Sequence, residues 1–264
     1  MAWVVRISLL VLLLGGMAAL SFLFFRQEQA DRQIDPETFC NVAIAPPQII
    51  AIGVDSSDPF TEVQIEAIRV QLSHALDQLP AGGLVEIYRM SAARGELTER
   101  LISVCNPGEQ ISFAQLLSTT SREEDELRSR YSERFVGAVQ RTLRREAASE
   151  SVSQSFILES IHAIGVQSFE RHPEVRDRRL IIVSDMLQNS DLYSHYRDGN
   201  VPISQLFSSN PSALFRPDLD GVVVDVLVVE RAGSSHRQTR ELLAWWEDYF
   251  RGSNAMIRQV RTIA

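Results

Sequence analysis

Two acidic residues stand directly after apolar, β-branched runs of the sequence, where they could bind a cation or a polar group of a ligand. Asp55 follows Ile49–Val54 in the stretch Asp55-Ser56-Ser57-Asp58, and Asp185 follows the run Arg179–Ser184. Carboxylate and hydroxyl oxygens are ligands that Mg²⁺ accepts. Two carboxylates that meet without a cation repel each other, which raises the pKa of one of them. A cation, an arginine or backbone N–H groups must therefore lie between Asp55 and Asp185 wherever they meet.

Motifs of the common enzyme classes are absent from the sequence. It contains no nucleophile elbow, no glycine-rich phosphate loop, no HExxH and no CxxC. The five histidines lie on separate segments without the spacing of metal ligands. A metal-dependent hydrolase or phosphatase-like enzyme, with Asp55 as nucleophile or metal ligand, remains the alternative to a binding function.

From residue 48 onward the chain alternates apolar strands with amphipathic helices. Thr61 and Gln64 form a predicted capping box at the start of the first helix. Further helices are predicted over 121–150, as a long surface helix, 156–169 and 242–250. Strands are predicted over 49–54, 84–90, 101–104, 179–184, 222–229 and 256–263, with the second and third paired as a hairpin and the last at an edge.

This alternation predicts an α/β fold with an open, mostly parallel, Rossmann-type sheet and helices on both faces. Ligands of such sheets bind beyond the carboxyl ends of the strands. Asp55 and Asp185 each end a buried parallel strand, so we expect both at the same edge of the sheet.

Residues 49–264 resemble the von Willebrand factor type A (VWA) family. That family has an Asp-x-Ser-x-Ser motif after its first strand, a threonine in a later loop and an aspartate after its fourth strand. Asp55 and Ser57 match the first two positions, and Asp185 matches the last aspartate. Ser155 matches the threonine, because the residues after it fit the family's spacing into the next helix. The resemblance departs at Pro59, which replaces the second serine.

The resemblance implies a metal-ion-dependent adhesion site that holds Mg²⁺ and binds another protein through the upper face of the sheet. Its ligands here would be Asp55, Ser57, Ser155 and Asp185, in a motif degraded by the loss of one ligand at Pro59. The alternative is that these side chains only hydrogen-bond loop backbone and cap helices.

Residues 1–26 are predicted to form a transmembrane anchor. Ile7–Phe25 contains 19 positions without a charge, bracketed by Arg6 and Arg26, which is just long enough for a hydrocarbon core of ~30 Å. A cleaved signal peptide is the alternative, but no small-residue cleavage site follows the apolar run. Residues 27–47 are predicted as a linker and 48–264 as the VWA-like domain.

The two cysteines, Cys40 and Cys105, form an even pair in a chain with an export anchor, which favours a disulfide. Two free thiols in a cytoplasmic domain are the alternative. A disulfide and a short tail before the anchor both favour a single-pass inner-membrane protein whose domain faces the periplasm or the cell exterior.

Composition narrows the function classes further. The chain is 45% apolar and carries a formal net charge of −8, from 26 basic and 34 acidic side chains. The acidic surface argues against nucleic acid as a partner. We therefore expect a non-catalytic, membrane-anchored protein-binding or assembly module, a subunit or scaffold of a bacterial envelope complex.

Overall fold

The computed structural model describes residues 37–90, 98–106, 137–147, 153–209, 215–231 and 233–264, together with 15–17, 20–21, 34–35 and 108. Within these residues, no helix combines the length and the apolar character needed to cross a bilayer. The predicted anchor falls mostly outside the described part of the chain, so it stays a prediction.

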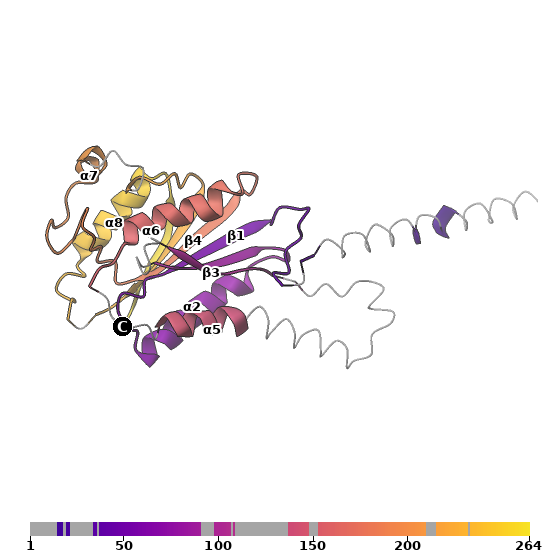
Figure 1. Ribbon diagram of the computed structural model, residues 1–264, viewed down its shortest axis with the longest axis horizontal. Helices are drawn as coiled ribbons and strands as arrows, with labels where there is room; N and C mark the ends of the chain where they lie inside the picture. Colours follow the sequence, from indigo (N-terminus) through magenta and orange to yellow (C-terminus); the bar gives the residue numbers. More distant parts are fainter. Residues whose placement is uncertain are drawn as a thin grey trace, which may run out of the picture.

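Six strands form one sheet in the order β3-β2-β1-β4-β5-β6 (Figure 1). All neighbours are parallel except β2 and β3, which pair antiparallel as the predicted hairpin. The prediction of an open, mostly parallel α/β sheet with β6 at an edge is therefore confirmed. The strands are β1 Gln48–Val54, β2 Leu84–Arg89, β3 Glu99–Cys105, β4 Asp177–Ser184, β5 Val222–Val229 and β6 Met256–Ile263.

Helices cover both faces of the sheet, as the alternation of strands and helices predicts (Figure 1). On one face lie α2 (Glu62–Asp77) and α5 (Gly137–Ala147), and on the other lie α6 (Ile157–Ile164), α7 (Ile203–Ser209) and α8 (Arg240–Gly252). Each face has its own apolar core of buried aliphatic and aromatic side chains. The α8 face holds most of the aromatic rings, including Trp245 and Trp246.

A local signal in the sequence sets the start of α2. The Thr61 hydroxyl accepts a hydrogen bond from the Gln64 backbone N–H, and the Gln64 side-chain oxygen accepts one from the Thr61 backbone N–H, so the predicted capping box is confirmed. The helix predicted over 156–169 continues from α6 into the π-helical turn η3 (Gly165–Glu170). Of the helix predicted over 121–150, the structure describes α5 and leaves the rest outside its described residues.

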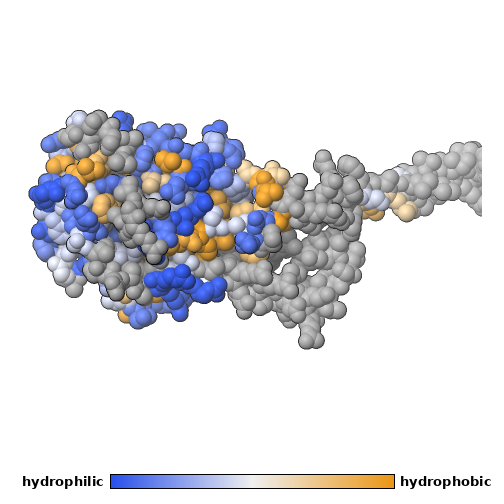
Figure 2. All heavy atoms as spheres, in the orientation of Figure 1, coloured by the Kyte–Doolittle hydropathy of each residue, from blue (hydrophilic) through white to orange (hydrophobic). Residues whose placement is uncertain are grey.

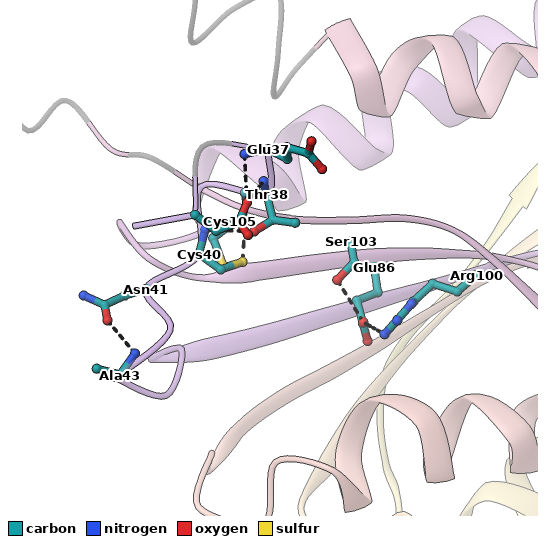
Figure 3. Close-up of a disulfide and its surroundings, with 10 residues drawn as sticks. Glu37, Thr38, Cys40, Asn41, Ala43, Glu86, Arg100, Ser103 and Cys105 are labelled. Atoms are coloured by element: carbon teal, nitrogen blue, oxygen red, sulfur yellow. Dashed lines mark hydrogen bonds and ion pairs between the residues drawn. A yellow bond between two sulfur atoms is a disulfide. The ribbon is translucent and has the colours of Figure 1, made fainter. Parts of the chain in front are cut away.

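A disulfide joins the segment before β1 to the end of β3 (Figure 3). Cys40 and Cys105 are bonded with a sequence separation of 65, which confirms the predicted pair. The Cys105 N–H also donates to the Thr38 carbonyl at 2.8 Å. We call this end of the sheet, where β1 begins, the amino edge, and the opposite end, where the parallel strands finish, the carboxyl edge.

Candidate functional site

Asp55 and Asp185 directly follow β1 and β4, two neighbouring parallel strands. These strands lie where the chain order of the sheet reverses, because β1 pairs with β2 on one side and with β4 on the other. In open α/β sheets this reversal opens a crevice at the carboxyl edge, and ligands bind there. The two residues therefore stand at the position where the topology favours a binding site.

Asp55 is the centre of a buried hydrogen-bond network. Its Oδ2 accepts from the hydroxyls of Ser155 at 2.9 Å and Ser184 at 2.8 Å. Its Oδ1 accepts from the Ser57 backbone N–H at 3.0 Å. Only 1% of Asp55 is exposed, so the carboxylate is shielded from bulk water. The three protein donors satisfy it in place of water. Three segments far apart in sequence are thereby fixed to one carboxylate.

Asp185 lies beside this network and is also buried. Its Oδ1 accepts from the Leu187 backbone N–H at 2.8 Å. Burial is the main cause that raises the pKa of Asp185 to about 7, and the negative charge of Asp55 raises it further. The Leu187 N–H and the Arg231 guanidinium act in the opposite direction. The expected repulsion between two carboxylates that meet is therefore only partly offset by these protein groups, and it appears as the raised pKa of Asp185.

Arg231 connects the end of β5 to the loop after β1. Its guanidinium donates to the backbone carbonyls of Asp58, at 2.9 Å, and Pro59, and it lies over the Phe60 ring at 5.0 Å from the centroid. Its own backbone N–H donates to the side chain of Gln238. The arginine therefore fixes the Asp58–Phe60 loop while it brings a positive charge toward Asp185.

The loop from Asp185 to Val201 is supported from beneath by α6 and α8. The Gln188 side-chain oxygen Oε1 accepts from the Leu158 N–H at 2.9 Å, so it caps α6, whose own N-cap residue Phe156 makes no side-chain hydrogen bond. Trp246 Nε1 donates to the Met186 carbonyl at 2.8 Å, and Trp245 Nε1 to the Val201 carbonyl at 2.6 Å. The tryptophans of α8 thus fix both ends of the loop.

His195 belongs to this loop, and its ring is buried among aromatic side chains. Its ring centroid lies 4.7 Å from that of Trp245 and 5.2 Å from that of Tyr193, both edge-on. Neither ring nitrogen has a hydrogen-bond partner among the described residues. Burial lowers the pKa of His195 to about 4, so the ring is neutral at neutral pH.

Above the buried carboxylates, the same loop exposes two large side chains, Leu192 and Tyr196. The Arg237 guanidinium lies over the Tyr196 ring at 4.8 Å from its centroid. The charges of Asp185 and Asp58 act on the Tyr196 hydroxyl, and burial is the main cause that raises its pKa. We call Leu192, Tyr196 and Arg237 the rim. Tyrosine and arginine are the residue types that most often dominate the energy of protein interfaces.

The residues singled out from the sequence meet at this edge in part through side chains and in part through backbone. Asp55 and Ser155 are in direct contact, and Ser57 contributes its N–H. Ser184 and Arg231 belong to the network but are missing from the predicted site. Ser184 is the last residue of β4, so the rule that identified Asp55 and Asp185 points to it as well, although it was not among the predicted ligands. Arg231 lies two residues after the end of β5, and the same rule could have identified it.

The oxygens around Asp55 fit a magnesium ion only in part. Mg²⁺ takes about six oxygens in near-octahedral geometry. Both oxygens of Asp55 already accept hydrogen bonds from the protein, and Pro59 adds no side-chain oxygen. Among the described residues, no three His, Cys, Asp or Glu side chains gather in a way that could hold a metal ion. The ligand set predicted for magnesium is Asp55, Ser57, Ser155 and Asp185, and its occupancy stays a prediction.

Comparison of the sequence with models of known protein families, and with curated proteins, finds no match. The functional argument therefore depends on the geometry of this edge.

Proposed function

We propose that the chain is a membrane-anchored binding and assembly module, and that its VWA-like domain binds another protein through the carboxyl edge. The observation that carries the proposal is the buried network of Asp55 beneath the exposed rim. The network holds three loops in one arrangement, and the rim presents an aromatic ring and a guanidinium above them. Fixed loops that display such side chains bind partners with little loss of conformational freedom.

Two features support the VWA-like assignment. The sheet has the order β3-β2-β1-β4-β5-β6 with only β3 antiparallel, which agrees with the fold that the resemblance implies. Asp55 and Ser155, which match two separate parts of the family motif, are hydrogen-bonded to each other.

The disulfide supports the proposed location outside the cytoplasm. Disulfides persist in oxidising compartments and are rare in the cytosol. With the anchor at residues 7–25 in the inner membrane, the domain would face the periplasm or the cell exterior and serve as a subunit or scaffold of a bacterial envelope complex.

The geometry of Asp55 favours binding over catalysis. A nucleophilic carboxylate must present an oxygen to its substrate. Asp55 is almost completely buried, and both of its oxygens accept hydrogen bonds from the protein. The carboxylate thus acts as an internal acceptor that shapes the edge.

The proposal is tested by cross-linking in native membranes, followed by purification of the full chain. Proteins recovered with the wild type should be lost with Tyr196→Ala, which removes the aromatic side chain of the rim. They should be kept with Val70→Ala, a truncation of a side chain that is exposed on α2. Equal recovery with both variants would contradict the proposal. The hydrolase alternative is tested with generic phosphate and ester substrates, using Asp55→Ala as the control.

A further inference from the structure

The amino edge exposes three large aliphatic side chains within eleven residues of sequence. Ile34, Val42 and Ile44 are 41%, 76% and 64% exposed, respectively. We call them the amino-edge patch. They border a hollow of about 750 Å³ whose walls include Pro46, Leu84 and the disulfide. Figure 2 shows apolar surface (orange) at this end of the domain, on the right of the view. Apolar side chains that gather on a surface mark contacts with a protein or a membrane.

The segment that carries this patch is held firmly. Ile34 and Asn41 form an antiparallel bridge, and the Asp35 carboxylate accepts from the N–H groups of Glu37 and Thr38. The disulfide at Cys40 then attaches the turn to β3. The patch is therefore part of the folded domain, and its exposure does not come from a loose chain end.

The amino-edge patch lies close in sequence to the predicted membrane segment. The predicted membrane segment ends at Phe25, nine residues before Ile34. Fully extended, nine residues span about 30 Å. The amino edge lies at the end of the domain opposite the C-terminus, which follows β6 at the carboxyl edge (Figure 1). The patch is thus held within a short distance of the bilayer surface.

We propose that the amino-edge patch lies against the headgroup region of the bilayer that holds the anchor. The proposal rests on the predicted anchor but not on the proposed partner binding. Aliphatic side chains that enter the boundary between headgroups and acyl chains are removed from water. Because the anchor tethers the domain, this contact is intramolecular, so a weak interaction is enough to orient the domain.

The charges at the amino edge indicate which lipid headgroups the patch would need for this contact. Among the described residues of this edge, the exposed charges are of both signs: Glu37, Arg171, Glu174, Arg176 and Asp177. Anionic lipids attract basic segments. We therefore expect the contact to form on zwitterionic phosphatidylcholine and not to strengthen when anionic lipid is added.

The test places a tryptophan at the patch and at a matched position far from it. Val42→Trp and Val63→Trp replace valines that are 76% and 72% exposed, the second in the first turn of α2 at the carboxyl edge. Both variants are made in the full chain with Trp3→Phe, which keeps the native Trp245 and Trp246. They are reconstituted, beside the Trp3→Phe parent, into phosphatidylcholine nanodiscs whose acyl chains are brominated, and the emission of the parent is subtracted from that of each variant. We expect the fluorescence at position 42 to shift to the blue and to be quenched, and the fluorescence at position 63 to stay unchanged.

Each other outcome overturns the proposal. Equal fluorescence at the two positions would show that the patch has no preference for lipid. A blue shift at position 42 without quenching would indicate a protein contact instead. A chain that does not float with phosphatidylcholine vesicles would remove the anchor on which the proposal rests. Partner binding at the carboxyl edge is measured separately, so its failure would not be confused with any of these results.

Discussion

The two ends of the sheet are held together by different interactions. At the amino edge, a disulfide and backbone hydrogen bonds close the domain, and the side chains that they display are aliphatic. At the carboxyl edge, two buried carboxylates are surrounded by hydroxyls, backbone N–H groups and an arginine. Burying like charges costs stability, whereas a covalent bridge restricts the unfolded chain and adds stability. The disulfide therefore stabilises the amino edge, whereas the carboxyl edge holds two buried like charges at a cost in stability.

This difference between the two edges agrees with what is general for parallel sheets. Loops at the carboxyl ends of the strands carry function, and the scaffold beneath them carries stability. Changes at the amino edge should therefore alter the free energy of unfolding more than binding. Truncation of the exposed rim side chains at the carboxyl edge should do the reverse.

The largest effect is expected from removing the bridge. Replacing both Cys40 and Cys105 with serine frees a loop with a sequence separation of 65. In the entropic account this lowers the free energy of unfolding by about 4 kcal/mol. Urea denaturation of the full chain measures the loss. The amount of partner recovered per folded molecule should stay at the wild-type level. A loss of the partner without a loss of stability would contradict the assignment of stability to the amino edge and of binding to the carboxyl edge.

His195 should make the carboxyl-edge loop sensitive to acid. Its pKa in the folded state is lowered to about 4, below the usual value near 6.5, so the unfolded state binds the proton more strongly. Stability is therefore lost as the pH falls from about 6.5 to about 4, by up to about 3 kcal/mol. His195→Phe should remove this part of the pH dependence. Identical slopes of unfolding free energy against pH for wild type and variant would contradict the assignment.

Substitutions of Asp55 test the hydrogen bonds and the charge interaction at the carboxyl edge. Asp55→Ala leaves the hydroxyls of Ser155 and Ser184 without their acceptor and should cost about 2 kcal/mol of unfolding free energy. Asp55→Asn keeps the shape and removes the charge. Because the charge of Asp55 raises the pKa of Asp185, that pKa should fall in the asparagine variant. Carboxyl NMR titration of Asp185 measures the change, and an unchanged pKa would show that the two carboxylates do not interact.

A smaller effect is expected at Arg231. Arg231→Lys keeps the charge but loses the paired donation to the carbonyls of Asp58 and Pro59, because lysine lacks the planar fork. We expect a loss of about 1 kcal/mol and faster hydrogen exchange in the 58–62 loop. Exchange at wild-type rates would mean that the arginine does not hold this loop.

The smallest shift is expected from magnesium. Millimolar Mg²⁺ should leave the thermal midpoint of the full chain unchanged, because Pro59 removes one ligand and both oxygens of Asp55 already accept hydrogen bonds from the protein. A ligand at 100 times its dissociation constant adds about 2.7 kcal/mol, which such a measurement detects easily. A clear rise that Asp185→Asn abolishes would show that the carboxyl edge is a metal site.

Much of the fold could be predicted because the local patterns agree with the final structure. The β-branched runs at 49–54, 179–184 and 222–229 are buried strands, and the Thr61 box begins a helix. Of the strand order, these patterns predict the β2–β3 hairpin and the edge position of the last strand. The disulfide was predicted from the export context of the pair and needed no knowledge of their separation in space.

The detailed arrangement at the carboxyl edge could not be predicted in the same way. Gln188 caps α6 from a different loop, and two tryptophans of α8 bind the backbone carbonyls at the ends of that loop. These contacts join segments 30 to 60 residues apart. Periodicity describes which face of an element is buried, but it does not say which polar group will meet which. Arg231 and the rim were missed for this reason.

The central claim is that the carboxyl edge binds a protein while the amino edge faces lipid, and site-specific photo-cross-linking tests both halves together. A photoreactive phenylalanine analogue is placed at Tyr196 or at Val42 of the full chain, and native membranes are irradiated. The account predicts a discrete protein adduct from position 196 and none from position 42. A protein adduct from position 42, with none from position 196, would contradict it.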